Sequence, residues 1–177
     1  MPEIAVTTPP QLHHGMGHDL CLAMKDLPGA DAAIMRSWAE LGFRLEISEA
    51  QIVSSLDAMG IYRPSIPMID HAGYRFLIDV DGVANAWSFF EKLLLGSCVL
   101  KVASPYEEWF YSDLTPWKHF VPVRADLSDL AERVAWCQSH PDEARRIGEQ
   151  GQRIALKHDM EHACRLGLAA IEASLIV

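Results

Sequence analysis

The residues best suited to chemistry lie between Asp79 and Ser88, where an apolar run ends in an acidic turn. Asp79 and Asp81 are two positions apart, so their carboxylates share one face of a strand. Gly82 lets the backbone turn without a side chain, and Asn85 brings a donor and an acceptor to the start of the next helix. Free backbone N–H groups at such a turn attract anions, so a sugar or a diphosphate would be a suitable ligand.

Two interpretations of the aspartate pair remain open. An Asp-x-Asp pair can ligate a divalent cation through its carboxylate oxygens. The same triplet at a strand end can instead cap the turn that follows, and this structural role is the favoured alternative because the pattern is short and common. In the helix that follows, Phe89 and Phe90 are expected in the core, whereas Trp87 lies near the helix start and can face a ligand.

Aromatic and polar residues gather again after Lys101. The aromatic side chains in this segment are Tyr106, Trp109, Phe110, Tyr111, Trp117 and Phe120. They suit a platform for a sugar or a base, and equally a packed loop over a sheet edge. His119 is a candidate acid, base or phosphate donor by its titration range, although a single histidine beside a strand more often has a structural hydrogen bond.

Composition narrows the class of protein. The chain has 177 residues, enough for one domain. Its 15 basic and 24 acidic side chains give a net charge of −9, which disfavours nucleic acid as a partner.

The four cysteines, Cys21, Cys98, Cys137 and Cys164, form no C-x-x-C pair and are expected to be reduced thiols. His13, His14 and His18 suggest a metal, but a plain arm is the favoured alternative. No signal segment or membrane-length apolar run is visible, so a soluble, cytoplasmic chain is expected.

The pattern along the chain predicts an α/β fold. Residues 1–30 are rich in Pro, Gly and His and predict an extended or flexible arm, and residues 31–177 predict one domain. Helices are expected over 31–41 and 48–59, followed by strand, helix and strand over 74–80, 85–95 and 98–103, and a short strand over 119–123. Three more helices are expected in the C-terminal third. The first ends at Ser139, the second starts at Pro141, and the third runs from Glu161 to Leu175. The apolar strands favour a parallel sheet with right-handed crossovers.

Several segments together resemble the C-terminal half of glycosyltransferase family 90, which contains capsule- and lipopolysaccharide-modifying enzymes and protein O-glucosyltransferases. The segments read YRFLIDVDGVANAWS, KLLLGSCVLKVASP, EEWFYSDLTPWKHFVPVRADLSDLAERVAW and DEARRIGEQGQRIA, and the resemblance runs from about Tyr74 to Ala155. It implies a Rossmann-like sheet flanked by helices, similar to the C-terminal lobe of a GT-B glycosyltransferase, that binds a UDP-sugar without a bound metal.

The resemblance also implies positions for the donor. The Asp81-Gly82 turn and the helix start from Asn85 through Trp87 to Ser88 would approach the diphosphate. The strand from Gly96 to Lys101 would line the floor of the site. His119 is a further candidate for the donor site from its residue type and not from the resemblance. Arg124 and Asp126 would approach the nucleoside. The expected reaction is transfer of a hexose or pentose to a hydroxyl of a saccharide or lipopolysaccharide. The expected location is the cytoplasm, with possible peripheral association with the inner membrane.

Two departures from the family pattern qualify this expectation. An arginine is common in the protein O-glucosyltransferase branch where Ser88 aligns, and the nearest cation here is Lys92, one helical turn later. The N-terminal lobe of the family, with its acceptor pocket and the aspartate expected to act as base, has no counterpart in these residues. No catalytic residue is therefore assigned, and the alternative is a non-catalytic nucleotide-sugar-binding or interaction module that pairs with a second chain or with itself.

Overall fold

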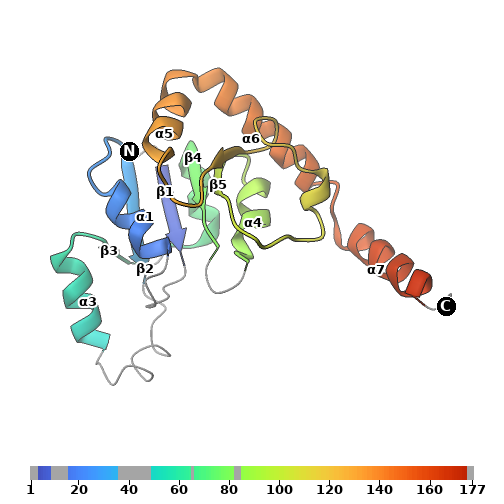
Figure 1. Cartoon of the computed structure of the whole chain (residues 1–177), viewed down its shortest axis with the longest axis horizontal. Coiled ribbons are helices and arrows are strands. Elements are labelled where there is room, and N and C mark those ends of the chain that lie inside the picture. The colour runs from blue at the N-terminus through green and yellow to red at the C-terminus, as the bar shows by residue number, and fades with distance from the viewer. Residues whose placement is uncertain (1–3, 9–15, 36–48, 65, 82–84, 175–177) are drawn as a thin grey trace.

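A parallel sheet forms the centre of the molecule. The structure is a computed structural model, and it describes all residues except 1–3, 9–15, 36–48, 65, 82–84 and 175–177 (Figure 1). Among the described residues six parallel strands lie in the order β3-β2-β1-β4-β5-β6. They are β1 (Ile4–Thr8), β2 (Ala30–Met35), β3 (Tyr62–Arg63), β4 (Phe76–Asp79), β5 (Cys98–Val102) and β6 (Val121–Val123). The α/β prediction with a parallel sheet is confirmed.

Helices cover both faces of this sheet. The described helices up to residue 155 are α1 (Met16–Met24), α3 (Glu49–Ala58), α4 (Ser88–Leu94), α5 (Leu130–Ser139) and α6 (Pro141–Ala155), and α7 (Met160–Ser174) follows them outside these layers. Every residue of β4 and β5 is buried, which explains why both strands are almost continuously apolar. Leu100 of β5 packs into a cluster with α1 and α5, whereas its neighbour Val99 packs with Phe89 and Leu93 of α4. Alternate side chains of one strand therefore face opposite helical layers.

The predicted strand, helix and strand in the centre of the chain are confirmed as β4, α4 and β5. The expected helix over 48–59 is α3, and the expected helical C-terminus is α5, α6 and α7. Pro141 occupies the first turn of α6 and Asp142 follows it, as the sequence predicts, because proline lacks the N–H that a first turn leaves unpaired.

The expected N-terminal arm needs correction. Residues 4–8 form β1, which pairs with β2 on one side and β4 on the other, and residues 16–24 form α1. The helix expected over 31–41 is also wrong, because its described start belongs to β2. The alanines of this segment favour a helix, but pairing with strands on both sides outweighs that intrinsic preference. His13 and His14 lie outside the described residues, and His18 belongs to α1.

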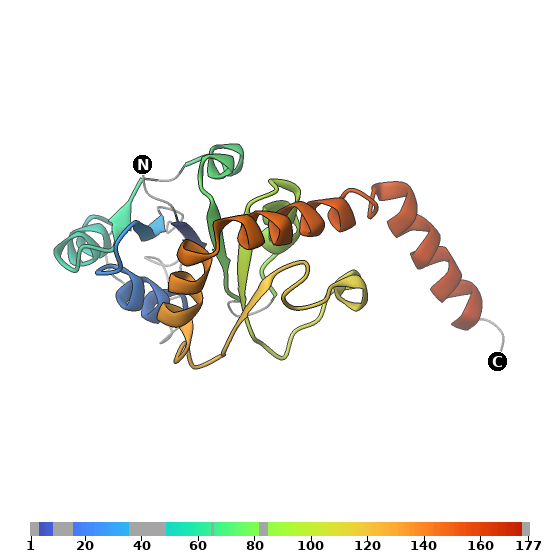
Figure 2. The same cartoon turned by 90° about the horizontal axis from the view of Figure 1, so that it is seen from above.

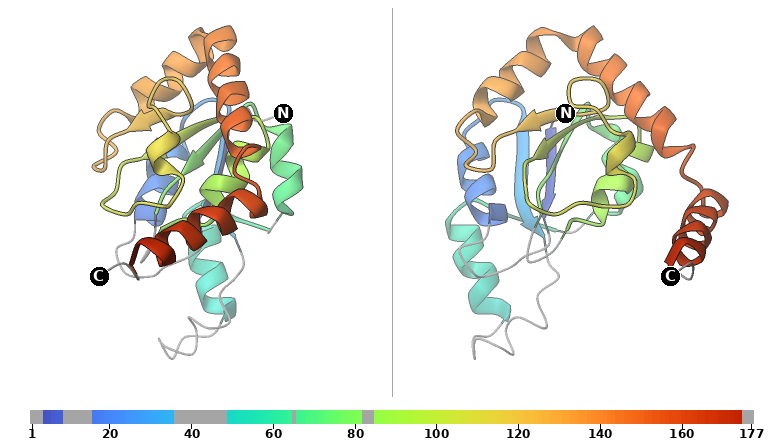
Figure 3. Two further views of the ribbon diagram at one scale, coloured as in Figure 1. Left: turned by 90° about the vertical axis from the view of Figure 1, so that its right-hand side faces the viewer. Right: turned by 45° about the vertical axis from the view of Figure 1, so that its right-hand side comes forward.

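Two glycines allow α6 to lie close against the sheet. A Cβ at Gly148 would be 2.5 Å from the carbonyl oxygen of Gly96, and one at Gly151 would be 2.6 Å from the carbonyl oxygen of His119. The helix therefore touches backbone directly at both places. After α6 the chain bends, and α7 extends away from the sheet with no buried residue (Figures 2 and 3).

Candidate functional site

The strand order reverses between β1 and β4, and this reversal locates the site. From β1 the sheet continues to β2 and β3 on one side, and from β4 it continues to β5 and β6 on the other. In open parallel sheets a crevice forms at the carboxyl ends of the strands where the order reverses, and ligands bind there. Asp79 ends β4 at this edge and Asp81 follows two residues later. Gly82 falls within residues 82–84, outside the described part of the chain.

Asp79 is a fully buried carboxylate held by two ammonium groups. Its Oδ1 lies 2.8 Å from Nζ of Lys92, and its Oδ2 lies 2.7 Å from Nζ of Lys101. Lys92 also donates to the carbonyl oxygen of Ile78 at 3.0 Å, and Ser88 donates to Asp79 at 3.2 Å. Ser88 and Lys92 are four residues apart on α4, so one side of this short helix points both donors at the strand.

Asp81 holds the chain that follows it. Its Oδ1 accepts hydrogen bonds from the backbone N–H of Ala86 at 2.6 Å and from Lys101 at 2.8 Å, and its Oδ2 accepts from the hydroxyl of Ser104. Asp81 is only 2% exposed. These bonds agree with the capping interpretation for Asp81, since its carboxylate closes the turn between β4 and α4.

The burial of these groups shapes their protonation. Burial alone would raise the pKa of Asp79, but the charges of Lys92 and Lys101 and their hydrogen bonds lower it below the usual value. Burial would lower the pKa of Lys101, but the charge of Asp79 and the hydrogen bonds that Lys101 donates to both aspartates raise it. Asp79 and Lys101 therefore both carry their charges at neutral pH. The cluster of Asp79, Asp81, Lys92 and Lys101 pairs two carboxylates with two ammonium groups.

The residues at the start of α4 border the same edge. Trp87 occupies the N-cap position and is 84% exposed, so its ring is available to a ligand. Asn85 is half-buried, one residue before Ala86. Ser88 and Lys92, both expected near the diphosphate, direct their donors at Asp79. Phe89 is buried, as expected for a core residue.

The remaining predicted residues divide between the two edges of the sheet. Arg124 and Asp126 follow the carboxyl end of β6 and are exposed, with the N–H of Arg124 bonded to Asp129 and Asp126 accepting from the N–H of Ser128. Hydrogen bonds from Ser128 lower the pKa of Asp126. His119 precedes β6 and therefore lies toward the opposite, amino-terminal edge. Its Nδ1 accepts the N–H of Thr115 at 2.9 Å, which matches the structural alternative for a single histidine.

The aromatic segment after β5 has a mixed role. Phe110 is buried with α4, whereas Tyr106, Trp109 and Trp117 are 40% to 47% exposed. Tyr111 lies near the charged cluster, with Nζ of Lys101 6.0 Å from its ring centroid, and its buried hydroxyl has no hydrogen-bond partner among the described residues. Burial is the main reason why its pKa rises to about 12.

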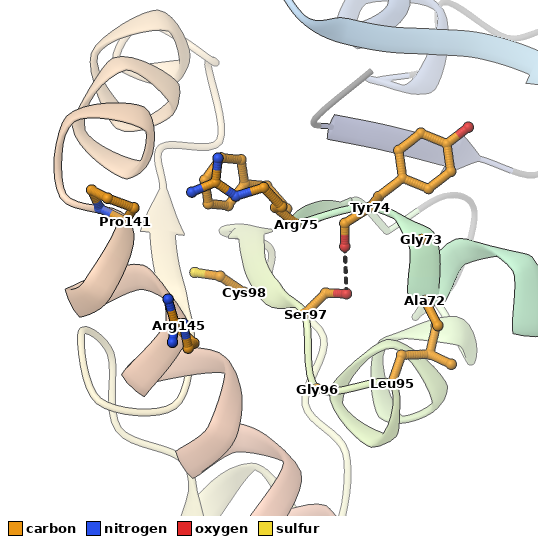
Figure 4. Close-up of a pocket in the computed structure, with 11 residues that line it drawn as sticks. Ala72, Gly73, Tyr74, Arg75, Leu95, Gly96, Ser97, Cys98, Pro141 and Arg145 are labelled. Carbon is orange, nitrogen blue, oxygen red and sulfur yellow. Dashed lines mark hydrogen bonds between the residues drawn. The ribbon is translucent and has the colours of Figure 1, made fainter. Parts of the chain in front are cut away.

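A pocket of about 260 Å³ opens at the amino-terminal edge, opposite Asp81. Figure 4 shows Arg75 and Arg145 among its lining residues, with Ser97 donating to the carbonyl oxygen of Tyr74 at 2.7 Å. Both arginines are exposed side chains, and the pocket contains none of the buried charged cluster. The strand reversal therefore carries more weight than this cavity in locating the site.

Some participants were missed by the sequence analysis. Ser104 was not singled out, although it follows β5 at the same edge where Asp81 follows β4, and adjacent parallel strands end together. The burial of Lys92 was also unforeseen, because lysine is rarely buried unless it is paired.

Among the described residues no group of three His, Cys, Asp or Glu side chains is placed to hold a metal ion, and no helix has the length and apolar character to cross a membrane.

Comparison with known proteins shows which family the sequence matches. The sequence model of glycosyl transferase family 90 matches residues 41–163. Protein O-glucosyltransferase 3 of Rattus norvegicus is 44% identical over 86 residues, which are 49% of this chain and 17% of that protein. Protein O-glucosyltransferase 2 of Danio rerio is 40% identical over 95 residues, which are 54% of this chain and 19% of that protein. The chain thus spans less than a quarter of the length of these curated relatives.

Solved structures share the fold. A glycosyltransferase from Rickettsia africae ESF-5 superposes with a TM-score of 0.68 and 15% identity, over 98% of this chain and 48% of that one. Anabaena Alr3699/HepE in complex with UDP-glucose superposes with a TM-score of 0.66 and 13% identity, over 97% of this chain and 49% of that one. The expected likeness to one lobe of a GT-B glycosyltransferase is therefore confirmed at the level of the fold.

Proposed function

The chain belongs to glycosyl transferase family 90, and on this premise we propose that the edge of the sheet at Asp81 binds the diphosphate and sugar of a UDP-sugar donor. One observation carries the proposal. Asp81 fixes the turn between β4 and α4 at the place where the strand order reverses, which is where open parallel sheets bind nucleotides. The Anabaena relative in fold was solved with UDP-glucose, which supports the same class of ligand.

The residues would divide the work of binding. Trp87 offers an exposed ring and Asn85 an amide at the start of α4, while Arg124 supplies a cation at the end of β6 for the nucleoside or its phosphates. Lys92 and Lys101 would not contact the donor directly, because their ammonium groups are bound to aspartates. No metal is needed in this proposal.

The reaction we propose is transfer of a hexose or pentose to an acceptor hydroxyl. The resemblance to the capsule- and lipopolysaccharide-modifying enzymes favours a saccharide or lipopolysaccharide acceptor, in the cytoplasm or at the inner membrane. The curated relatives are named protein O-glucosyltransferases, which supports a protein hydroxyl instead. The carboxylates of Asp79 and Asp81 are both ion-paired, so neither is free to act as base, and the base would come from elsewhere.

Thermal unfolding with UDP tests the binding proposal. A ligand at 100 times its dissociation constant stabilises the folded state by about 2.7 kcal/mol, so UDP and UDP-glucose should raise the Tm, and ADP should do so less. Trp87→Ala should reduce the UDP shift. Ile69→Ala, which removes a side chain that is 70% exposed before β4, is the matched control and should keep it. No shift with any UDP-sugar at millimolar concentration would contradict donor binding.

A second assay separates an enzyme from a non-catalytic binder. Incubation of the chain with UDP-glucose and either a saccharide or a protein acceptor should release UDP if the chain is active alone. Binding without release of UDP would favour the alternative, in which the chain binds a nucleotide sugar but requires a second chain for transfer.

A further inference from the structure

Lys101 lies between the two carboxylates of the Asp-x-Asp pair. Its Nζ is 2.7 Å from Oδ2 of Asp79 and 2.8 Å from Oδ1 of Asp81. Lys101 sits beside Asp79 on the neighbouring strand, so the sheet register itself delivers the ammonium to this position. The side chain of Lys101 is 7% exposed, and those of the two aspartates are 0% and 1% exposed.

An ammonium bridging two carboxylates occupies the place where a divalent cation would bridge them. Mg²⁺ binds carboxylate oxygens at about 2.0–2.1 Å and Ca²⁺ at about 2.3–2.6 Å, from a position between the ligands. Lys101 supplies one positive charge from such a position, and Lys92 supplies a second on the other oxygen of Asp79. Two buried negative charges are therefore matched by two positive charges without any ion from solution.

The geometry keeps Lys101 from direct contact with a donor. Two of its three N–H groups are used by the aspartates, and its Nζ lies 5.0 Å from the ring centroid of Phe89. Its influence reaches the edge of the sheet through Asp81, which holds the N–H of Ala86 and the hydroxyl of Ser104. Lys101 is thus a positioning residue for the turn between β4 and α4.

We infer that Lys101 is a built-in cation that takes the place of a divalent metal ion between Asp79 and Asp81. This inference rests on the proposed function only where it concerns the UDP-sugar donor. By fixing Asp81, Lys101 keeps the edge of the sheet at the carboxyl end of β4 in the geometry that binds the donor. Removal of the ammonium leaves two adjacent carboxylates and a space, which is a site for a small divalent cation or for a primary ammonium ion.

Lys101→Ala tests this directly. The variant should lose roughly 10 °C in Tm because it leaves buried charge unpaired. Mn²⁺ at millimolar concentration, and separately ethylammonium chloride, should restore a substantial part of that loss, whereas tetramethylammonium chloride, which has no N–H, should not. Electron paramagnetic resonance should show Mn²⁺ bound to Lys101→Ala and not to Lys101→Ala/Asp79→Asn. The wild-type chain should bind no Mn²⁺ at this pair.

Lys118→Ala is the matched control, because Lys118 is an exposed lysine outside the cluster. It should keep the wild-type Tm and show no response to Mn²⁺ or ethylammonium. UDP binding is measured in the same samples, and UDP affinity should fall at least roughly tenfold in Lys101→Ala and recover with Mn²⁺.

The outcomes separate the inference from the proposed function. If the wild type binds no UDP but Mn²⁺ stabilises Lys101→Ala, the donor proposal fails and the role of Lys101 stands. If UDP binds the wild type but neither cation stabilises Lys101→Ala, the role of Lys101 is overturned. Mn²⁺ binding to the wild type that disappears in Asp81→Asn would also overturn it.

Folding failure is covered by a second variant. If Lys101→Ala is unfolded alone, refolding in the presence of Mn²⁺ or ethylammonium becomes the measurement. The same measurement is then made on Lys101→Gln, which should be less destabilised because its amide N–H groups can still donate to the carboxylates. A chain that refolds under none of these conditions counts against the inference, because a cation site requires that an added cation rescue folding.

Discussion

Asp79 combines complete burial with a full negative charge, and this makes it the most consequential single side chain of the cluster. Its two lysine partners come from different elements, Lys92 from α4 and Lys101 from β5. An aspartate whose pKa is lower in the folded than in the unfolded chain stabilises the fold at pH values above the unfolded pKa. That stabilisation is lost as the pH falls through the lower, folded pKa.

Asp79→Asn is therefore expected to reduce the free energy of unfolding at neutral pH by about 3–5 kcal/mol, because it leaves buried ammonium charge uncompensated. It should also flatten the loss of stability below about pH 4, the unfolded pKa of an aspartate. Urea unfolding at several pH values measures both effects. Asp142→Asn, at an exposed first-turn position of α6, should shift the free energy of unfolding by no more than about 0.5 kcal/mol. An unchanged acid profile in Asp79→Asn would contradict the assignment.

His119 offers a second test at the residue scale. Burial, and to a lesser degree the charge of Lys118, lowers the pKa of His119, so its neutral form is the one that accepts the N–H of Thr115. Its contribution to stability is present above pH of about 6.5 and is lost as the pH falls through the lower, folded pKa. His119→Leu should cost about 1 kcal/mol or more by leaving that N–H unpaired, and His119→Asn, which offers an acceptor, should cost less. Equal losses in the two variants would argue against the hydrogen bond.

At the scale of elements, α6 depends on its glycines. Gly148 and Gly151 bring the helix against the backbone at the start of β5 and before β6, and this contact fixes the helix over the sheet next to α4. A methyl group at Gly148 has no room, since the three nearest atoms all belong to the backbone. One at Gly151 would meet the carbonyl oxygen of His119 and Cδ2 of Leu93.

Gly148→Ala should lower the free energy of unfolding by about 1–3 kcal/mol through overpacking. Gly167→Ala in α7 is a control with the same change in a helix, and there a Cβ would meet nothing within 4 Å. The control should be neutral or stabilising by about 0.5–1 kcal/mol, because alanine is the better helix former. Urea midpoints compare the two, and a stabilised Gly148→Ala would show that α6 sits further from the sheet.

The elements that could be predicted are those whose pattern is local. The apolar runs and glycine turns of β4, α4 and β5 are visible in the sequence, and so is the acidic turn at Asp81. The short β1 and the alanine-rich β2 were misjudged, because they are strands only by pairing with each other and with β4. The placement of Lys92 likewise depends on a partner 13 residues away and on the crossing of α4 over the strand.

At the scale of the whole molecule, α7 is the exposed apolar element. Met160, Leu168 and Ile171 are 57% to 79% exposed, and Cys164 between them is exposed as well. Their spacing places these four side chains on one side of the helix. Apolar side chains exposed along one side of a helix favour association with another protein surface. The sequence places its expected self-association at the face of the missing lobe, so a contact through α7 is a separate prediction.

The chain is therefore expected to self-associate under reducing conditions, and Leu168→Lys/Ile171→Lys should shift the population toward monomer. Sedimentation equilibrium over a range of concentrations measures this. Ala169→Lys, on the opposite side of α7, is the control and should associate like the wild type. A wild-type chain that stays monomeric at every concentration would show that α7 is not a contact between copies.

The position of β1 has a consequence for synthesis. β1 leaves the ribosome well before β4, which begins at Phe76, yet it becomes an interior strand hydrogen-bonded to β2 and β4. Until those later residues emerge, one long edge of the nascent β1–β2 pair lacks its permanent neighbour and presents unsatisfied amides and carbonyls to other polypeptides. Maturation of this protein thus includes an interval of vulnerability to aggregation, and a chaperone that shields an open strand edge would act during that interval.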